Sequence, residues 1–214
     1  MIPGWDLDHH DGLPFRFHLP SGYEPSRRYP VVVYLHGSGE RGDDTWAHLK
    51  NGVEALRAHE LIAVAPQCPK ADTFGGSWYG GESATQRKVV SLVRALAGRS
   101  SVDPRRISAI GFSMGGIGLW DLLLRHPGLF SAAVPVASDL EPEAAARALA
   151  GFPIWAFHGE VDELVSNASV RRLTGLLGPP FRYTELPGVG HDSWRGAFEH
   201  PELVPWLLAQ RSTS

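Results

Sequence analysis

Short apolar runs alternate along the chain with segments whose apolar residues recur at helical spacing, and turns rich in Gly and Pro separate them. Residues 15–19 alternate apolar and polar side chains with a period of two, which predicts a half-buried edge strand. The other predicted strands cover residues 30–35, 61–65, 106–110, 132–137, 153–157 and 181–186. The predicted helices cover residues 84–97, 116–125, 141–150, 167–177 and 201–210, and residues 46–59 form a further amphipathic segment.

This alternation of strand and helix predicts an α/β fold, with a parallel doubly wound sheet flanked by helices and joined by right-handed crossovers. Residues 30–35 are an almost unbroken apolar run, which is typical of a central strand covered on both faces. No repeat or low-complexity tract interrupts the pattern. A chain of 214 residues with 43% hydrophobic content fits one domain, residues 1–214, with a sizeable core.

Charge and composition argue against several classes of function. The net charge is −3 and Lys and Arg form no cluster, which argues against nucleic acid or an anionic membrane as a partner. A single cysteine, Cys68, excludes an internal disulfide framework and a Cys-based metal site. His9, His10 and Asp11 lie together, but without further ligands they are interpreted as surface residues. We therefore expect no metal and no cofactor, and the sequence leaves the oligomeric state open.

The N-terminus offers no targeting signal. Its first residues, Met-Ile-Pro-Gly-Trp-Asp, have neither the basic region nor the apolar run of a signal peptide. No stretch has the apolar length needed to cross a bilayer. A cytoplasmic location is therefore expected, although a leader removed earlier would leave no trace.

The most informative motif is Gly-Phe-Ser-Met-Gly at residues 111–115, between a predicted strand and a predicted helix. This setting matches the nucleophile elbow of α/β-hydrolases, in which Ser113 sits at a tight, strained turn. Side chains at Gly111 and Gly115 would collide with the neighbouring strand and helix. The start of the helix would aim free N–H groups at whatever reacts with Ser113.

A second glycine-rich loop, residues 36–44, follows the central strand. In α/β-hydrolases the equivalent loop supplies an N–H group to the oxyanion hole. The predicted donors are the N–H of Met114 and that of Ser38, with Gly37 as the alternative to Ser38. Glu40, Arg41, Asp43 and Asp44 are interpreted as an ion-pair set that stiffens the loop, not as catalytic groups.

The order nucleophile, acid, histidine then places the other members of a catalytic triad. The turn after residues 153–157 presents Asp162, the preferred acid, with Glu163 and Asp139 as alternatives. The glycine-rich turn after residues 181–186 presents His191. A Ser hydroxyl needs a base, and the pKa of His lies near neutrality. The carboxylate fixes the tautomer of the histidine and stabilises the imidazolium.

The remaining candidates concern the surroundings of this site. His36 and His158, each at a strand end before Gly, are interpreted as structural hydrogen-bonding groups, and His126 as a helix-end cap. Trp78 and Tyr79 lie on a long irregular stretch at the ligand-binding edge of the sheet and are candidates for a substrate wall, with buried packing as the alternative for Trp78. Only residues 137–141 separate a strand from the next helix, which leaves no room there for a lid.

Five motifs together resemble one family: HGSGERGD at residues 36–43, VDPRRI at 102–107, GFSMGG at 111–116, HPGLF at 126–130 and GHDSW at 190–194. The chain resembles small serine esterases labelled "phospholipase/carboxylesterase" or "predicted peptidase", which are related to feruloyl-esterase and dienelactone-hydrolase-like enzymes. The resemblance covers about residues 13–210. It departs from the dienelactone hydrolases proper, whose nucleophile is Cys where this chain has Ser113.

The resemblance implies hydrolysis of carboxylic esters through an acyl-enzyme, with Ser113, Asp162 and His191 as the triad. An open aromatic cleft favours short-chain or aryl esters, hydroxycinnamoyl esters among them. An acyl-thioesterase or a peptidase of the same fold is the alternative within enzymes. A catalytically silent α/β-hydrolase that binds a small ligand is the alternative from another class.

Overall fold

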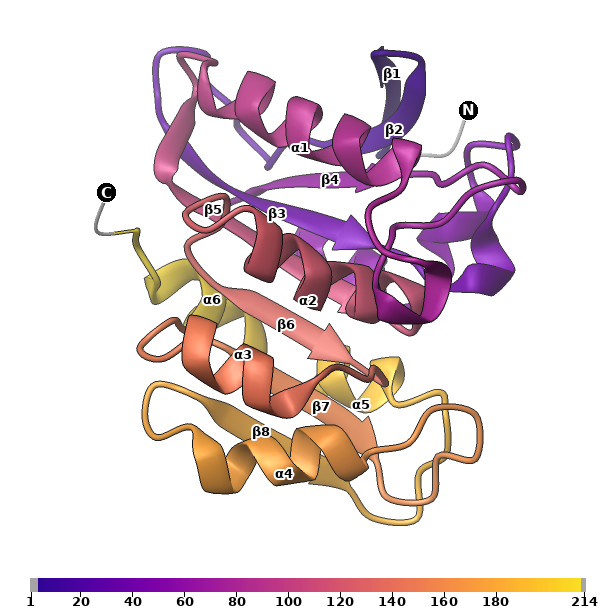
Figure 1. Ribbon diagram of the computed structural model, residues 1–214. Coiled ribbons are helices and arrows are strands. Elements are labelled where there is room, and N and C mark those ends of the chain that lie inside the picture. The colour runs from indigo at the N-terminus through magenta and orange to yellow at the C-terminus, as the bar shows by residue number, and fades with distance from the viewer. Residues whose placement is uncertain (1–3, 213–214) are drawn as a thin grey trace.

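The computed structural model describes residues 4–212, which form one eight-stranded sheet between two layers of helices (Figure 1). The first three residues, part of the stretch examined for a targeting signal, lie outside the described residues. The strand order is β1-β2-β4-β3-β5-β6-β7-β8. The strands are β1 Asp6–His10, β2 Leu13–His18, β3 Tyr29–Leu35, β4 Ile62–Pro66, β5 Val102–Phe112, β6 Ala133–Val136, β7 Trp155–Gly159 and β8 Arg182–Leu186.

Strands β3 to β8 run parallel, as predicted, whereas β1 and β2 are antiparallel to their neighbours. The segment predicted as an edge strand, β2, lies between β1 and β4. That prediction was wrong because the real edge strand, β1, has the polar sequence DLDHH, which shows almost no apolar alternation. β1 pairs with β2 through backbone hydrogen bonds. A pattern of apolar and polar side chains does not reveal such bonds.

The helices are α1 Ala84–Ala97, α2 Met114–Arg125, α3 Pro142–Ala148, α4 Ala168–Leu176, α5 Trp194–Glu199 and α6 Leu203–Ala209. Helix α1 is confirmed to the residue, and the Ser83 side chain caps it by accepting the N–H of Gln86 at 3.0 Å. The amphipathic segment 46–59 forms two short 3-10 helices, η2 Ala47–Leu49 and η3 Val53–Ala58. Helix α5 escaped prediction because it is only six residues long and contains a glycine.

The central strand β3 contributes to both cores, which explains its unbroken apolar run. Val31, Val33 and Leu35 face the core under α1 to α4, whereas Val32 and Tyr34 face the core under η3, α5 and α6. All five side chains are buried. A strand covered on both faces cannot alternate with polar residues.

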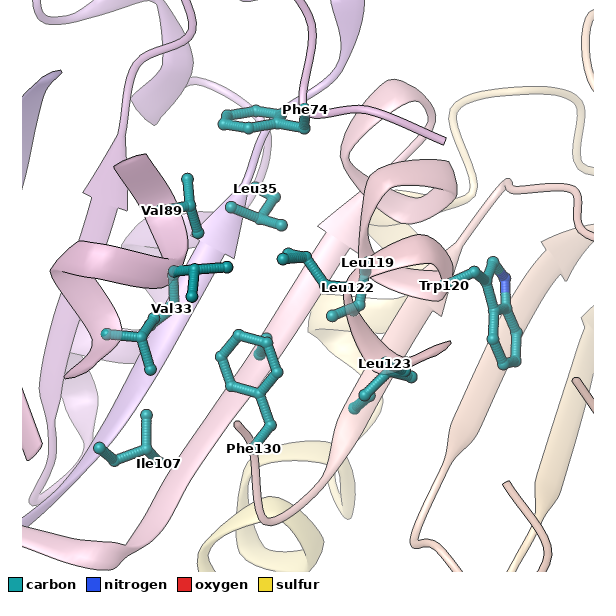
Figure 2. Packing of buried hydrophobic residues seen from close by; sticks show 14 of the residues in the cluster. Val33, Leu35, Phe74, Val89, Ile107, Leu119, Trp120, Leu122, Leu123 and Phe130 are labelled. Atoms are coloured by element: carbon teal, nitrogen blue, oxygen red, sulfur yellow. The ribbon is translucent and has the colours of Figure 1, made fainter. Parts of the chain in front are cut away.

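The first of these cores fixes the position of α2 against the sheet. Figure 2 shows Leu119 and Leu122 of α2 pointing toward Val33 and Leu35 of β3. Phe74, from the stretch after β4, closes the same core at the end of the sheet that carries the site, and it is fully buried. The start of α2 is therefore held rigidly at the carboxyl end of β5.

The loops at this edge of the sheet are short. Five residues, 137–141, connect β6 to α3, so no lid is inserted there, as predicted. Within residues 4–212, no helix is both long and apolar enough to span a bilayer.

Candidate active site

Ser113 occupies the turn between β5 and α2 with φ 52° and ψ −116°. A positive φ is unfavourable for a residue with a side chain and costs on the order of 1–3 kcal/mol. The surrounding backbone holds it there, because the Ser113 N–H donates to Val136 O at 2.9 Å and its carbonyl accepts the Ile117 N–H at 2.9 Å. The strained turn predicted for a nucleophile elbow is present.

The two glycines of the motif are required by close backbone contacts. A Cβ atom at Gly111 would lie 2.3 Å from the carbonyl oxygen of Gly115 in α2. A Cβ atom at Gly115 would lie 2.0 Å from the carbonyl oxygen of Leu35 in β3. The predicted collisions are confirmed, and they show how tightly the start of α2 is packed against two strands.

Ser113, His191 and Asp162 form one hydrogen-bonded chain. His191 Nε2 lies 2.9 Å from Ser113 Oγ, and His191 Nδ1 lies 2.9 Å from Asp162 Oδ2. The carboxylate can only accept, so Nδ1 carries the proton and Nε2 accepts the Ser113 hydroxyl. The three residues follow β5, β7 and β8, so the parallel sheet delivers them to one edge.

The Asp162 side chain is fully buried and remains anionic. Its Oδ1 accepts the N–H groups of Leu164 at 2.9 Å and Val165 at 3.0 Å. Burial by itself raises the pKa of this carboxyl, but the hydrogen bonds from Val165, His191 and Leu164 outweigh it and hold the pKa below its usual range. The acid is therefore an anion at neutral pH.

The acid loop and the histidine loop touch through their backbones. A Cβ atom at Gly159 would lie 2.1 Å from Gly190 O, so only glycine allows this approach. The N–H of Val161 donates to Val189 O at 3.0 Å. These contacts set the distance between the carboxylate and the imidazole.

The two alternative acids lie elsewhere. Asp139 accepts the Trp78 Nε1–H at 3.1 Å and the Ser169 hydroxyl instead of a bond from His191. Glu163 is exposed next to Asp162. The structure thus brings Asp162, and neither alternative, against the histidine.

The loop after β3 begins with the 3-10 helix η1 Ser38–Glu40, preceded by Gly37. Ser38 and Met114 each occupy the first position of a helix, where the helix itself supplies no acceptor for the N–H group. Their N–H groups are therefore available to an anionic ligand at the elbow. The Gly37 carbonyl accepts the Glu40 N–H at 3.3 Å and so closes η1.

His36 anchors this loop through two hydrogen bonds, which is the structural role predicted for it. Its Nδ1–H donates to Gly37 O at 2.6 Å, and its Nε2 accepts the N–H of Cys68 at 2.9 Å. Burial lowers the pKa of His36 to about 3, against a smaller opposing effect of the bond to Gly37. His126 follows the last turn of α2, as predicted, and its ring contacts Glu82 at 3.2 Å.

Gln67 is a further anchor that the sequence analysis did not identify. Its amide, fully buried at the end of β4, donates to Glu40 O at 3.0 Å and accepts the Thr45 N–H at 2.7 Å. The middle and the end of the loop after β3, residues 36–45, here called the η1 loop, are thereby tied to the neighbouring strand. The only signal was a polar residue directly after a buried apolar run.

Trp78 and Tyr79 form the 3-10 helix η4 Ser77–Tyr79 and are 49% and 37% exposed. The alternative of buried packing for Trp78 is therefore wrong. Its indole is tied to Asp139 after β6, whereas the charge of Arg41, after β3, acts on Tyr79. Helix η4, which carries both rings, packs against α2, the helix that follows the elbow. A cavity of about 70 Å³ lies between Ser77 of η4, helix α2 and residues 139–141, and no member of the triad lines it.

Comparisons with known proteins identify the family and the fold of the chain. The model of the family described as "Putative esterase" matches residues 10–212. The chain is 27% identical over 202 residues to the putative esterase NocK of Nocardia uniformis, covering 89% of this chain and 54% of that protein. It is 27% identical over 158 residues to feruloyl esterase B of Piromyces equi, covering 69% of this chain and 28% of that one. The chain thus spans about half or less of the length of these relatives.

Among solved structures, a thermostable esterase superposes with a TM-score of 0.88 and 29% identity, covering 99% of this chain and 64% of that one. The feruloyl esterase module of Clostridium thermocellum superposes with a TM-score of 0.64 and 16% identity, covering 96% and 87%. At that identity the second likeness concerns the fold alone, which is the α/β-hydrolase fold.

Proposed function

The chain belongs to the putative esterase family, and we propose that it is a serine carboxylic-ester hydrolase. Ser113 is the nucleophile, His191 the general base and Asp162 its partner. The observation that carries the proposal is the pair of 2.9 Å hydrogen bonds that link these three side chains at the carboxyl edge of the sheet.

In the acylation step, Ser113 Oγ attacks the ester carbonyl carbon while His191 Nε2 takes the hydroxyl proton. The carbonyl oxygen becomes an oxyanion, which the N–H groups of Met114 and Ser38 stabilise. His191 then gives its proton to the leaving alkoxide, so that the alcohol departs and the acyl-enzyme remains. Each preorganised oxyanion donor contributes on the order of 10²–10³-fold in kcat.

In the deacylation step, a water molecule takes the place of the alcohol. His191 Nε2 removes one of its protons as the oxygen attacks the acyl carbon, and the same proton returns to Ser113 Oγ. The products are the carboxylic acid and the free enzyme. Throughout, the Asp162 carboxylate keeps the proton on Nδ1 and stabilises the transient imidazolium.

Short-chain and aryl esters, hydroxycinnamoyl esters among them, are the proposed substrates. Support comes from the exposed rings of Trp78 and Tyr79 in the stretch after β4. A planar group stacked on an aromatic side chain gains about 0.5–1.5 kcal/mol beyond burial. The likeness to a feruloyl esterase supports the same class. Distal methylenes of a long chain would stay in water and forgo about 0.8 kcal/mol each.

Peptide hydrolysis is a second candidate, favoured by one observation. The chain is 25% identical over 161 residues to dipeptidyl-peptidase 5 of Porphyromonas gingivalis, although it spans only 23% of that protein. The same triad could cleave an amide if the leaving amine were protonated by His191. An amide substrate therefore belongs in the test.

The test is a hydrolysis panel with wild-type protein and two variants. The panel contains aryl esters graded by acyl length, methyl hydroxycinnamates, an acyl-CoA thioester and a dipeptidyl anilide. We expect aryl and short-chain esters to be best, and Ser113→Ala to lose at least about 10³-fold in kcat. Ser21→Ala, an exposed serine in the turn after β2, is the control.

A fluorophosphonate probe separates the alternatives independently of substrate choice. Wild type and Ser21→Ala should be labelled, and Ser113→Ala should not. Labelling of Ser113→Ala, or retained activity in that variant, would refute the nucleophile assignment. Wild-type protein that is neither labelled nor active would be a silent ligand-binding hydrolase.

A further inference from the structure

A second histidine contacts the acid of the triad. His158, in β7, is fully buried, and its Nε2 lies 3.2 Å from Asp162 Oδ2 and 3.1 Å from Val165 O. The same Oδ2 lies 2.9 Å from His191 Nδ1. One carboxylate oxygen is therefore shared between two imidazole rings, only one of which reaches the serine.

The surroundings of His158 fix its protonation. Both neighbours of Nε2 are hydrogen-bond acceptors, so Nε2 carries the proton. Nδ1 is buried and has no hydrogen-bond partner within residues 4–212. A second proton there would be an unpaired buried donor, which is costly. Burial likewise lowers the pKa of His158, so the ring is a neutral donor from Nε2.

We propose that His158 is a positioning residue for the catalytic acid, which sets both the orientation of the Asp162 carboxylate and the share of its charge that reaches His191. The inference rests on the proposed function of the triad. Two backbone N–H groups donate to Asp162 Oδ1 and His191 Nδ1–H donates to Oδ2. His158 Nε2–H, whose hydrogen bond goes to Val165 O, lies 3.2 Å from the same Oδ2.

The shared oxygen has a consequence for the base. A donor from His158 disperses part of the Asp162 charge, which weakens the attraction of the carboxylate for a protonated His191. Loss of that donor should therefore favour the imidazolium. The other charged groups near His158 are on β8 and α4, where Glu185 is paired with Arg171 at 2.6 Å. Since that pair is unchanged in a His158 variant, the effect should come through Asp162.

Two substitutions of similar size and shape separate hydrogen bonding from space filling. In His158→Gln, the side-chain NH₂ group occupies the place of Nε2–H and can still donate to Asp162. In His158→Met, a side chain of similar length fills the same space without a donor. Thermal unfolding of both variants shows how much of any loss comes from stability.

The measurement is the pH dependence of kcat/KM on one aryl ester. For His158→Met we expect a plateau about tenfold below wild type, because the acid is less firmly oriented. The midpoint of its acid limb should rise by about half to one pH unit. The change should lie mainly in kcat, with KM little altered. His158→Gln should stay close to wild type in both respects.

Equal midpoints of the acid limb of kcat/KM in His158→Met and His158→Gln would overturn the proposal. His158 would then only fill space in the core. Ser113→Ala in the same assay separates this outcome from failure of the proposed function. If Ser113→Ala is inactive and the two His158 variants agree, only the role of His158 is refuted. If Ser113→Ala remains active, the triad itself is wrong.

A measurement on wild-type protein stands even if His158→Met fails to fold. In spectra of ¹⁵N-histidine-labelled protein, assigned with the folded His158→Gln variant, His158 should appear as the neutral Nε2–H tautomer at neutral pH. A neutral Nδ1–H tautomer, or a charged ring at neutral pH, would contradict a donor to Asp162.

Discussion

Acid should destabilise the folded protein well before its carboxylates titrate, because two buried histidines lie beneath the η1 loop. Burial lowers the pKa of His36 to about 3 and that of His48 to about 4. Both rings are fully buried, with their centroids 5.7 Å apart. His48 donates from Nε2 to Ala65 O at 3.0 Å, and its buried Nδ1 has no hydrogen-bond partner in the part of the chain that the structure describes.

The sign and size of this loss of folding stability follow from proton linkage. In the unfolded chain both rings titrate near 6.5, so below that pH the unfolded state binds protons that the folded state rejects. Stability is therefore full above about pH 6.5 and falls as the pH decreases toward the folded values of about 4 and 3. Between pH 7 and pH 5 the loss is about 2 kcal/mol per ring, or about 4 kcal/mol for both.

Two other groups modify this sum. His158, whose pKa burial also lowers, adds to the loss. Glu40 acts in the opposite direction, because burial raises its pKa and the folded state then takes up a proton more readily at low pH. Since a domain is stable by about 5–15 kcal/mol, a loss of about 4 kcal/mol is readily measured.

The assay is equilibrium unfolding in urea at pH 7, 6 and 5, followed by tryptophan fluorescence. In His48→Gln the side-chain amide replaces the donor to Ala65 but cannot titrate, so about 2 kcal/mol of the difference between pH 7 and pH 5 should disappear. His9→Gln, at an exposed position of β1, is the control and should not change the difference. Equal stability of wild type at pH 7 and pH 5, or an unchanged difference in His48→Gln, would refute the reasoning.

Three further predictions concern the site. Asp162→Asn should lose more than about 100-fold in kcat/KM and Asp139→Asn only a few-fold; the reverse order would show that the acid is misassigned. Gly115→Ala should lose at least about 2 kcal/mol in urea unfolding, because its Cβ would meet a β3 carbonyl at 2.0 Å. Its control, Gly175→Ala in α4, meets nothing within 4 Å and should gain up to about 1 kcal/mol; equal effects would show that the elbow can relax. Trp78→Ala should raise KM for aryl esters more than for methyl or ethyl alkyl esters, and unchanged aryl-ester kinetics would argue against an aromatic wall.

Local signals were sufficient wherever neighbours in sequence determine the structure. The apolar run of β3, the capped helix α1 and the glycines at positions 111 and 115 each leave a pattern within a few residues. The fold class follows from the alternation of such elements, because parallel strands joined by helices have few arrangements. The order of Ser113, Asp162 and His191 could be predicted for the same reason: in a parallel sheet, all loops after the strands meet at one edge.

Contacts between distant segments decided the rest. Asp139 and Asp162 both follow strands, and only the close approach of Gly159 to Gly190 brings Asp162 to the histidine. The polar strand β1 exists because β2 offers it a backbone edge, not because of its side chains. The contact of His158 with the shared acid and the hold of Gln67 on the η1 loop likewise need residues from different strands to meet. Such contacts depend on strand order and backbone distance, which leave no periodic pattern in the sequence itself.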